Sequence, residues 1–430
     1  MAEVRAFRGF RYDLGHVGTL SDVVAPPYDV ISPALQQQLA QRSPYNVIRL
    51  ELPTEVPDDT DTHNKYTRAA NTLREWIAAG IVRQDTARSL YLYEQEFESE
   101  GITHTRRGFL GRVRLEPFGT GKVFPHEQTF SGPKEDRLKL YRATGFNISP
   151  IFSLYPDPEG EVARVFEPFV HTSPPLVAKD HLGVTSRLWV VTDSHAISTI
   201  TGIMGSKPLY IADGHHRYET ALKYLEERRA VGEVRDDESP ANFTLMLLVA
   251  MSDPGLVIQP THRLLSGMSP LNSQALEQLI RQHFAIVERS GTDAKAAWEF
   301  IQMDGTQSLL GFGTASDKEW FVARLRDEKV MAELVPNHSP QWRGLAISVL
   351  HNLVIGRLFD GKPTCRYVHL LDEAREALHV QDCQVAVLVP PVTMQHVEEL
   401  CRLGEKMPQK STYFYPKVLT GLVFNSLKKD

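Results

Sequence analysis

The residues best placed for chemistry lie where a short apolar run turns into the start of a helix, within residues 208–222. In order, these residues are Asp213, Gly214, His215, His216 and Arg217. A helix N-terminus already carries about half a positive charge and has N–H groups without intrahelical acceptors, so three basic side chains there call for an anion. Phosphate suits such a site because the N–H groups, the helix dipole and the arginine fork all match its oxygens. The pattern therefore predicts a phosphate site over 214–217, and its alternative is that Asp213 caps the helix while neutral histidines pack locally.

A stiff loop presents the carboxylate of Asp29. Pro26 and Pro27 force an extended approach to it, and Ser32 with Pro33 begins a helix directly afterwards. A Pro-Pro pair also serves simply to shape a turn. We keep Asp29 as a candidate functional carboxylate beside that alternative.

A second group of reactive side chains occupies residues 122–138, and its spacing matches neither a zincin helix nor a phosphate-binding P-loop. Pro133 suits the first turn of a helix, on which Lys134 and Arg137 stand three residues apart and face one way. Glu127 precedes this helix on an irregular loop, where catalytic carboxylates commonly lie. We expect phosphate contacts from Lys134 and Arg137 and a general base in Glu127; a charged surface helix is the alternative.

A segment near the end of the chain, residues 407–417, combines two lysines, the hydroxyls of a serine and a threonine, and three aromatic side chains. Its candidate phosphate-binding residues are Lys410, Ser411 and Thr412. They are expected on a loop that leads to a strand, either as a lid over the phosphate or as part of an aromatic tail that docks on the core.

Composition excludes several classes of protein. Hydrophobic residues make up 42% of the chain, charged residues 23%, and the net charge is −6, so there is no basic field for nucleic acid. The three cysteines lie far apart without a Cys-x-x-Cys pair, which argues against a disulfide framework and favours a reducing cytoplasm. The N-terminus has no apolar signal region and the longest apolar run is too short to span a bilayer, so we expect no membrane partner. Oligomeric state is left open.

Periodicity predicts a mixed α/β (α+β) fold. The 430 residues suggest several domains, which we place at residues 1–175, 176–270 and 271–430. Strands are expected at 46–52, 89–97, 107–115, 147–155, 187–192, 209–211, 243–251, 308–312, 320–324 and 385–389. Helices are expected at 33–39, 66–79, 161–170, 194–203, 274–283, 293–302 and 342–359.

Four blocks of the sequence resemble a widespread prokaryotic family, domain of unknown function 1015. They lie at residues 26–31, at 126–127 with 132–138, at 212–219 and at 407–412. The resemblance runs nearly end to end. The segment 213–217 also resembles the signature of the ParB/sulfiredoxin-like fold, and most of all its free-serine kinases, in which that segment holds nucleotide phosphates. Histidine stands where the sulfiredoxin branch needs a cysteine, and neither the helix-turn-helix domain nor the basic surface of the partition branch is apparent. The resemblance implies a ParB/sulfiredoxin-like nucleotide-binding core with additional α/β segments.

These observations lead to one functional hypothesis, a cytoplasmic phosphotransferase that moves a phosphoryl group from ATP or ADP to a small hydroxyl metabolite. Free L-serine as the acceptor comes from the resemblance alone. Residues 214–217 would hold phosphate oxygens, Glu127 or Asp29 would take the acceptor proton, and Asp213 would bind Mg²⁺ or orient a histidine. The rival hypotheses are a non-catalytic nucleotide-binding regulator and a purely structural use of the motif.

Overall fold

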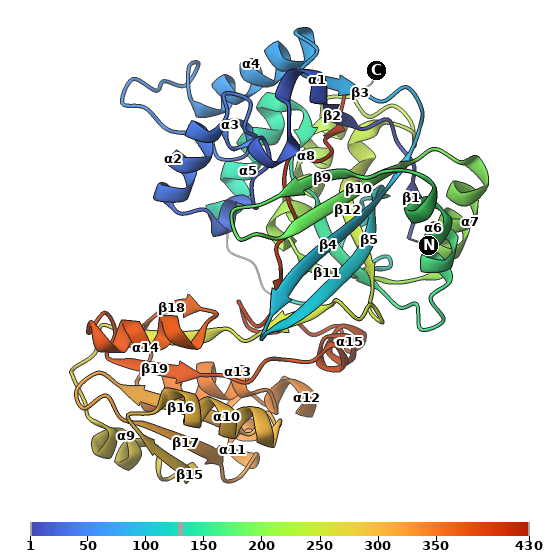
Figure 1. Ribbon diagram of the computed structural model, residues 1–430. Coiled ribbons are helices and arrows are strands. Elements are labelled where there is room, and N and C mark those ends of the chain that lie inside the picture. The colour runs from blue at the N-terminus through green and yellow to red at the C-terminus, as the bar shows by residue number, and fades with distance from the viewer. Residues whose placement is uncertain (1, 128–131, 429–430) are drawn as a thin grey trace. The chain divides into compact units, whose positions relative to one another are not determined.

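The computed structural model describes residues 2–127 and 132–428, and the chain forms two compact units (Figure 1). Unit 1 comprises Met1–Pro125, Thr129–Leu256 and Pro416–Asp430, and unit 2 comprises His126–Gln128 and Val257–Tyr415. This division differs from the three regions predicted at 1–175, 176–270 and 271–430. The C-terminal residues belong to unit 1 because Ala25 pairs with Thr420 and Phe10 with Phe424, and local periodicity carries no signal of such long-range pairings.

A nine-stranded mixed sheet forms the centre of unit 1. Its order is β6 (Val123–Pro125), β11 (Leu209–Asp213), β8 (Ile151–Tyr155), β12 (Phe243–Ala250), β5 (Ile102–Arg114), β4 (Leu90–Ser99), β10 (Thr185–Val191) and β9 (Leu176–Lys179), with β1 (Val4–Arg5) paired to β5. The pairs β6–β11 and β8–β12 are parallel, and the others are antiparallel. The apolar run predicted as a buried strand is β12, which lies between β8 and β5 with nearly every side chain buried.

The principal helices of unit 1 are α2 (Pro33–Arg42), α3 (Ile48–Glu51), α4 (Lys65–Ala78), α5 (Gly132–Thr144), α6 (Glu161–Thr172), α7 (Ser194–Ser206) and α8 (His215–Ala230). Shorter elements are α1 (Leu14–Val17), η1 (Leu20–Asp22), η2 (Tyr28–Val30), η3 (Pro240–Asn242), the strand pair β2 (Phe10–Tyr12) with β3 (Val82–Gln84), and the pair β7 (Phe146–Asn147) with β21 (Asn425–Ser426). Helix α5 packs against both α4 and α8. The core joins one face of the sheet to α6, α7 and α8 through Phe109, Leu248, Phe166, Ile200 and Tyr218.

The strand predicted at 46–52 is wrong, because this segment forms a turn followed by the short helix α3. The Asn46 side chain causes the difference. Its carbonyl oxygen accepts from the Ile48 backbone N–H at 2.9 Å, and its amide donates to the carbonyl oxygens of Asp22 and Val24 at 2.8 and 3.1 Å. These hydrogen bonds to a segment some twenty residues away override the local alternation of apolar residues.

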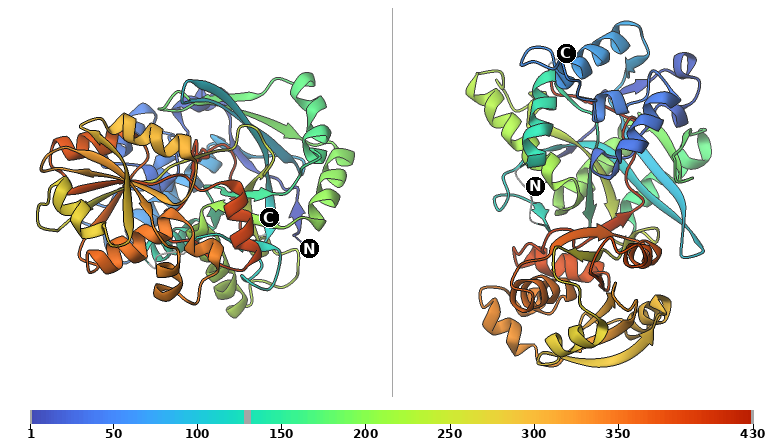
Figure 2. Two further views of the ribbon diagram at one scale, coloured as in Figure 1. Left: turned by 90° about the horizontal axis from the view of Figure 1, so that it is seen from below. Right: turned by 90° about the vertical axis from the view of Figure 1, so that its left-hand side faces the viewer.

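Unit 2 contains a six-stranded antiparallel sheet (Figure 2). Its order is β15 (Phe284–Gly291), β17 (Trp320–Leu325), β16 (Leu309–Thr314), β19 (Val385–Leu388), β14 (His262–Ser266) and β18 (Thr364–Val368), and β13 (Val257–Gln259) pairs separately with β20 (Tyr413–Tyr415). The helices are α9 (Ser273–Ile280), α10 (Ala294–Asp304), α11 (Lys329–Leu334), α12 (Pro340–Arg343), α13 (Ala346–Val349), the π-helix η4 (Leu350–Leu358), α14 (Leu371–His379) and α15 (Met394–Arg402). The single helix predicted at 342–359 is therefore divided, because α12 ends at its C-cap Gly344 and α13 starts anew.

The predicted mixed α+β class is confirmed by these two sheets and the helices around them. Across residues 2–127 and 132–428, no helix combines the length and the apolar composition that a membrane crossing requires.

Candidate functional site

The predicted strand, turn and helix over 208–222 is confirmed: β11 ends at Asp213 and α8 begins at His215. Gly214 joins them with φ +93° and ψ 28°, in the left-handed region. A Cβ at this position would lie 2.9 Å from Nε of Arg217, so the arginine side chain folds back over the glycine. Both the backbone conformation and this close approach require glycine here.

The Arg217 guanidinium belongs to the interior rather than to the surface, since the residue is 4% exposed. Its Nη1 donates to the carbonyl oxygen of Pro150, and its Nη2 lies 3.5 Å from Oδ2 of Asp213. The same carboxylate oxygen lies 3.3 Å from Nζ of Lys417. Burial by itself would lower the pKa of Arg217, but the negative charges around it, that of Asp213 first, raise this pKa above its ordinary value. Asp213 is thus the counter-charge of two cations, while the N-cap of α8 is Gly214, without a side-chain cap.

A second buried guanidinium comes from Arg137 on α5, which is 2% exposed. Its Nη1 donates to the backbone oxygen of Glu51 at 2.6 Å, and its Nε donates to Oδ2 of Asp136 at 2.9 Å. The guanidinium also lies over the ring of Tyr28, 4.3 Å from the ring centroid. Sequence analysis predicted that Arg137 contacts phosphate together with Lys134; the structure places Arg137 in a buried network, because segments far away in the chain cover it.

Glu51, the last residue of α3, is the residue that sequence analysis missed. It is 1% exposed, and its Oε1 has no hydrogen-bond partner among the described residues. The guanidinium of Arg137 approaches this oxygen only to 3.8 Å. A buried carboxylate oxygen without a hydrogen bond is costly, so native structures retain few of them and each needs an explanation. The only sequence signal is an acidic residue inside an apolar run, Ile48-Arg-Leu-Glu-Leu52, which reads equally as the polar position of a strand.

Tyr28 and Asp29 complete the arrangement from the short helix η2, which follows Pro27. Burial raises the pKa of Tyr28, with a further increase from the charge of Asp29 and opposing contributions from Arg137 and Arg217. The same charges appear around Arg217, whose pKa responds to both Asp29 and Glu51. We call these residues the arginine–carboxylate cluster: Tyr28, Asp29, Glu51, Arg137, Asp213, Arg217 and Lys417. Asp213 lies 3.5 Å from Arg217 and the charge of Asp29 also acts on that guanidinium, while a shared phosphate site of these residues stays a prediction.

The remaining predicted residues of unit 1 lie on the first turns of α5 and α8. Lys134 of α5 forms an ion pair with Glu219 of α8, so it ties the two helices together. His215 is 6% exposed and His216 is half-buried. The backbone oxygen of His216 accepts from Oγ1 of Thr220 at 2.7 Å.

Glu127 belongs to unit 2, where its carboxylate holds a loop. Its Oε1 accepts three hydrogen bonds at 3.1 Å, from the backbone N–H groups of Ser411 and Thr412 and from Oγ1 of Thr412. Nε2 of His126 lies 2.8 Å from the same hydroxyl. These contacts give Glu127 a positioning role in the loop 407–412, and its predicted role as a base stays a prediction. Residues 128–131 of the predicted second group lie outside the described residues.

The loop 407–412 is held from a second side by Arg263 of β14. This residue is 1% exposed, and its Nη2 donates to the backbone oxygens of Lys410 and Gln409 at 2.7 and 3.3 Å. Lys410 itself is exposed and has a φ of +56°, a conformation that non-glycine residues seldom adopt. Two buried or half-buried side chains therefore fix the backbone of a loop whose lysine faces solvent.

A metal role for Asp213 does not fit the residues present. Its carboxylate is already paired with Arg217 and Lys417, and two cations at that distance compete with a divalent ion. Over the described part of the chain, no three His, Cys, Asp or Glu side chains are arranged to hold a metal ion.

Comparison with known proteins gives one family match, to the family described as "Protein of unknown function (DUF1015)", over residues 4–348. No curated protein matches the chain. Among solved structures, a free serine kinase in complex with AMP is similar with a TM-score of 0.34 and 16% identity, over 70% of this chain and 89% of that chain. A truncated SbnI from Staphylococcus aureus has a TM-score of 0.35 and 14% identity, over 75% and 90% of the two chains. A conserved hypothetical protein from Pyrococcus furiosus has a TM-score of 0.34 and 14% identity, over 70% and 92%. Similarity at this level carries no argument about activity.

Proposed function

We propose, for a chain that belongs to the DUF1015 family, that the arginine–carboxylate cluster transfers a phosphoryl group from ATP or ADP to the hydroxyl of a small metabolite. The observation that carries the proposal is the Glu51 carboxylate, which is 1% exposed, has an Oε1 without a hydrogen bond and stands beside a buried guanidinium. Because this oxygen accepts no hydrogen bond from the described residues, its lone pairs can accept a proton. Free L-serine as the acceptor rests only on the resemblance of segment 213–217 to free-serine kinases.

The chemistry needs a proton acceptor, positive charge around the transferred group and precise positioning. In the proposed step, the acceptor oxygen forms a bond to the terminal phosphorus, the bond from that phosphorus to the leaving nucleotide oxygen breaks, and Glu51 takes the acceptor proton. The N-terminus of α8 contributes the positive end of a 16-residue helix without a side-chain cap, and His215 and His216 stand in its first turn. Arg217 orients this turn, and Asp29 is the second candidate for the proton acceptor.

A nucleotide-binding regulator is the second candidate function, and the state of the arginines favours it. Nε and Nη2 of Arg137 already donate to Asp136 and its Nη1 to Glu51, while Arg217 donates to Pro150. Guanidinium groups that are held in this way support a rigid binding turn but leave fewer donors for a transition state. A regulator would use α8 as an anion site without transfer.

The test is incubation of the purified chain with L-serine and either γ-labelled ATP or β-labelled ADP, with Mg²⁺ and with a chelator, followed by detection of labelled O-phosphoserine. If Glu51 is the base, Glu51→Gln lowers turnover roughly 10²–10⁴-fold while nucleotide affinity stays nearly unchanged. The matched control is Glu55→Gln, because Glu55 is exposed and pairs only with Lys65 among the described residues. Nucleotide binding without transfer to any acceptor would establish the regulator, and absence of nucleotide binding would contradict both functions.

A further inference from the structure

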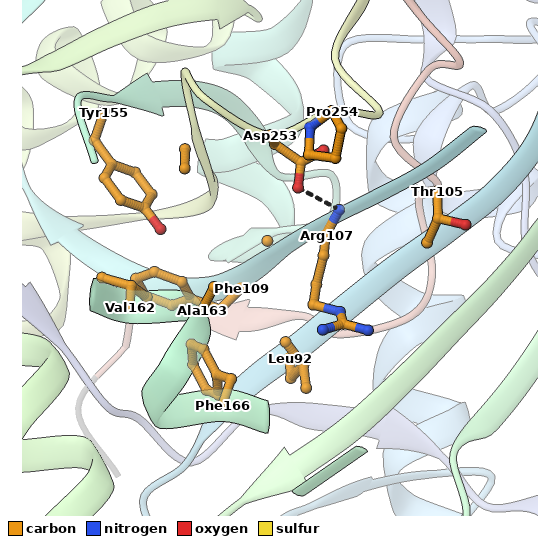
Figure 3. Close-up of a pocket in the computed structure, with 12 residues that line it drawn as sticks. Leu92, Thr105, Arg107, Phe109, Tyr155, Val162, Ala163, Phe166, Asp253 and Pro254 are labelled. Atoms are coloured by element: carbon orange, nitrogen blue, oxygen red, sulfur yellow. Dashed lines mark hydrogen bonds between the residues drawn. The ribbon is translucent and has the colours of Figure 1, made fainter. Parts of the chain in front are cut away.

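A cavity of about 340 Å³ lies in unit 1 between the strands β4, β5, β8 and β12 and the helix α6 (Figure 3). None of the residues that line it belongs to the arginine–carboxylate cluster. Its volume falls within the range of pockets that bind small molecules. It therefore needs an explanation separate from phosphoryl transfer.

The walls of the cavity are apolar and aromatic. Phe109 of β5 lies 5.3 Å from Phe166 of α6 and 6.3 Å from Tyr155 of β8, measured between ring centroids. Leu92 of β4 and Val162 of α6 complete the apolar lining, and all five side chains are at most 3% exposed. At these separations the three rings contact one another and form one aromatic wall of the cavity, against which a flat ring can pack.

The Tyr155 hydroxyl is a polar group that faces the cavity (Figure 3). Tyr155 is 3% exposed, and its hydroxyl forms no hydrogen bond with any of the described residues. Figure 3 shows this hydroxyl directed into the cavity. A phenol that forms no hydrogen bond within the protein can donate one to a ligand in the cavity. Burial, and then the charges of Asp157 and Asp253, raise the pKa of Tyr155. The hydroxyl therefore keeps its proton and can donate a hydrogen bond.

The charged groups of the lining disfavour an anionic ligand. Asp253 lines the cavity, with Oδ2 accepting from the Arg107 backbone N–H at 3.2 Å and Oδ1 from the Gly255 backbone N–H at 2.9 Å. The guanidinium of Arg107 forms ion pairs with Glu94 and Glu167, with Nη2 2.9 Å from Oε2 of Glu94 and Nη1 2.8 Å from Oε2 of Glu167. The one cation of the lining is thus neutralised, and the carboxylate of Asp253 is left to accept hydrogen bonds from a ligand.

We propose that this cavity is a binding site for a small aromatic molecule that contains nitrogen and is neutral or cationic. Its ring packs against the wall that Phe109 and Phe166 form, a ring nitrogen accepts from the Tyr155 hydroxyl, and an amino group donates to Asp253. This site is independent of the proposed phosphotransferase activity, so the two proposals are tested separately.

The probe is 2-aminobenzimidazole, titrated against the full chain by saturation-transfer NMR and calorimetry, with 2-naphthoate as an anionic probe of similar size. Three variants test the geometry. Ala163→Trp adds bulk at an exposed lining position of α6 and should abolish binding, whereas Arg164→Trp, at the neighbouring exposed position outside the lining, should not. Tyr155→Phe removes a hydroxyl that has no partner in the protein and should weaken binding about fivefold without lowering the Tm.

Saturable binding of 2-aminobenzimidazole that is lost in Ala163→Trp, weakened in Tyr155→Phe and absent for 2-naphthoate supports the proposal. Equal binding by all variants, or no saturable binding at millimolar probe, overturns it. Displacement of the probe by ATP or AMP overturns the claim of a separate site. If Ala163→Trp misfolds, Tyr155→Phe still decides, because circular dichroism and Tm report its fold independently.

Discussion

Replacement of Gly214 by alanine tests the organisation of the turn between β11 and α8. Gly214 has φ +93° and ψ 28°, and its missing Cβ would stand 2.9 Å from Nε, 3.0 Å from Cζ and 3.0 Å from Nη2 of Arg217. A flexible side chain at the surface would move aside at little cost. Arg217 is 4% exposed and donates to Pro150, so its displacement breaks a buried charged hydrogen bond.

The expected loss of stability has two parts. The left-handed conformation costs an alanine about 1–2 kcal/mol. A hydrogen bond from a charged group contributes about 1.5–3 kcal/mol. Gly214→Ala should therefore lower the free energy of unfolding by roughly 3–4 kcal/mol, of which about 2 kcal/mol comes from Arg217.

Gly160 supplies a matched control within unit 1. It is also a left-handed N-cap glycine, at φ +63°, and nothing lies within 4 Å of a Cβ built on it. Gly160→Ala should show only the conformational cost, so the Tm of Gly214→Ala should fall about 4–8 °C further, measured by calorimetry. In a double-mutant cycle, Gly214→Ala combined with Arg217→Ala should cost about 2 kcal/mol less than the sum of the single changes. Equal Tm values for the two glycine variants would refute the reasoning.

Two further predictions concern unit 2. Burial, and next the charge of Arg263, lower the pKa of His262 to about 3 in the folded protein. This folded pKa lies below the unfolded value of 6.5. The stability that neutral His262 provides is therefore complete above pH 6.5 and is lost as the pH falls towards 3. His262→Gln should remove up to about 1.4 kcal/mol per pH unit from the slope of stability in denaturant titrations, whereas His379→Gln, at an exposed position, should leave the slope unchanged. Glu127→Ala removes the acceptor of three hydrogen bonds to Ser411 and Thr412, so trypsin should cut after Lys410 roughly 10–100 times faster than in the parent chain. The comparison variant is Glu398→Ala, which loses only a surface pair with Arg402, and equal cleavage rates in the two variants would contradict the positioning role of Glu127.

Features that depend on near neighbours could be predicted from the sequence. The run over 243–250 is the buried strand β12 because all its side chains except Thr244 are apolar, and Asp213-Gly214 is a turn because glycine adopts its left-handed backbone without steric cost. Capping residues marked helix starts in the same way, as at Ser32, whose hydroxyl accepts from the Leu35 N–H. The signal in each case lies within a few residues of the feature.

The parts of the site that escaped prediction depend on distant residues. Arg137 resembles a surface residue until Glu51, 86 positions earlier, accepts its hydrogen bond and Tyr28 covers its guanidinium. In the sequence, Glu127 resembles a free general base, but in the structure its Oε1 accepts hydrogen bonds from backbone N–H groups 284 and 285 positions later in the chain. Glu51 was hidden because the alternation around it is typical of a strand, and only the distant contacts of Asn46 make it helical. A single sequence holds no record of such pairings.

These contacts also change the argument from which the phosphate site was inferred. Three basic residues at one helix start were expected to need an external anion, but Asp213 already supplies the counter-charge for Arg217 and does the same for Lys417. An internal ion pair of this kind fixes the turn before any ligand arrives, since a buried guanidinium that lost Asp213 would be left uncompensated. What remains for an anion is the positive end of α8, whose N-cap Gly214 provides no side-chain cap. In the proposed function, phosphate recognition would therefore depend on the helix start rather than on Arg217, and Glu51 would distinguish a transferase from a simple anion site.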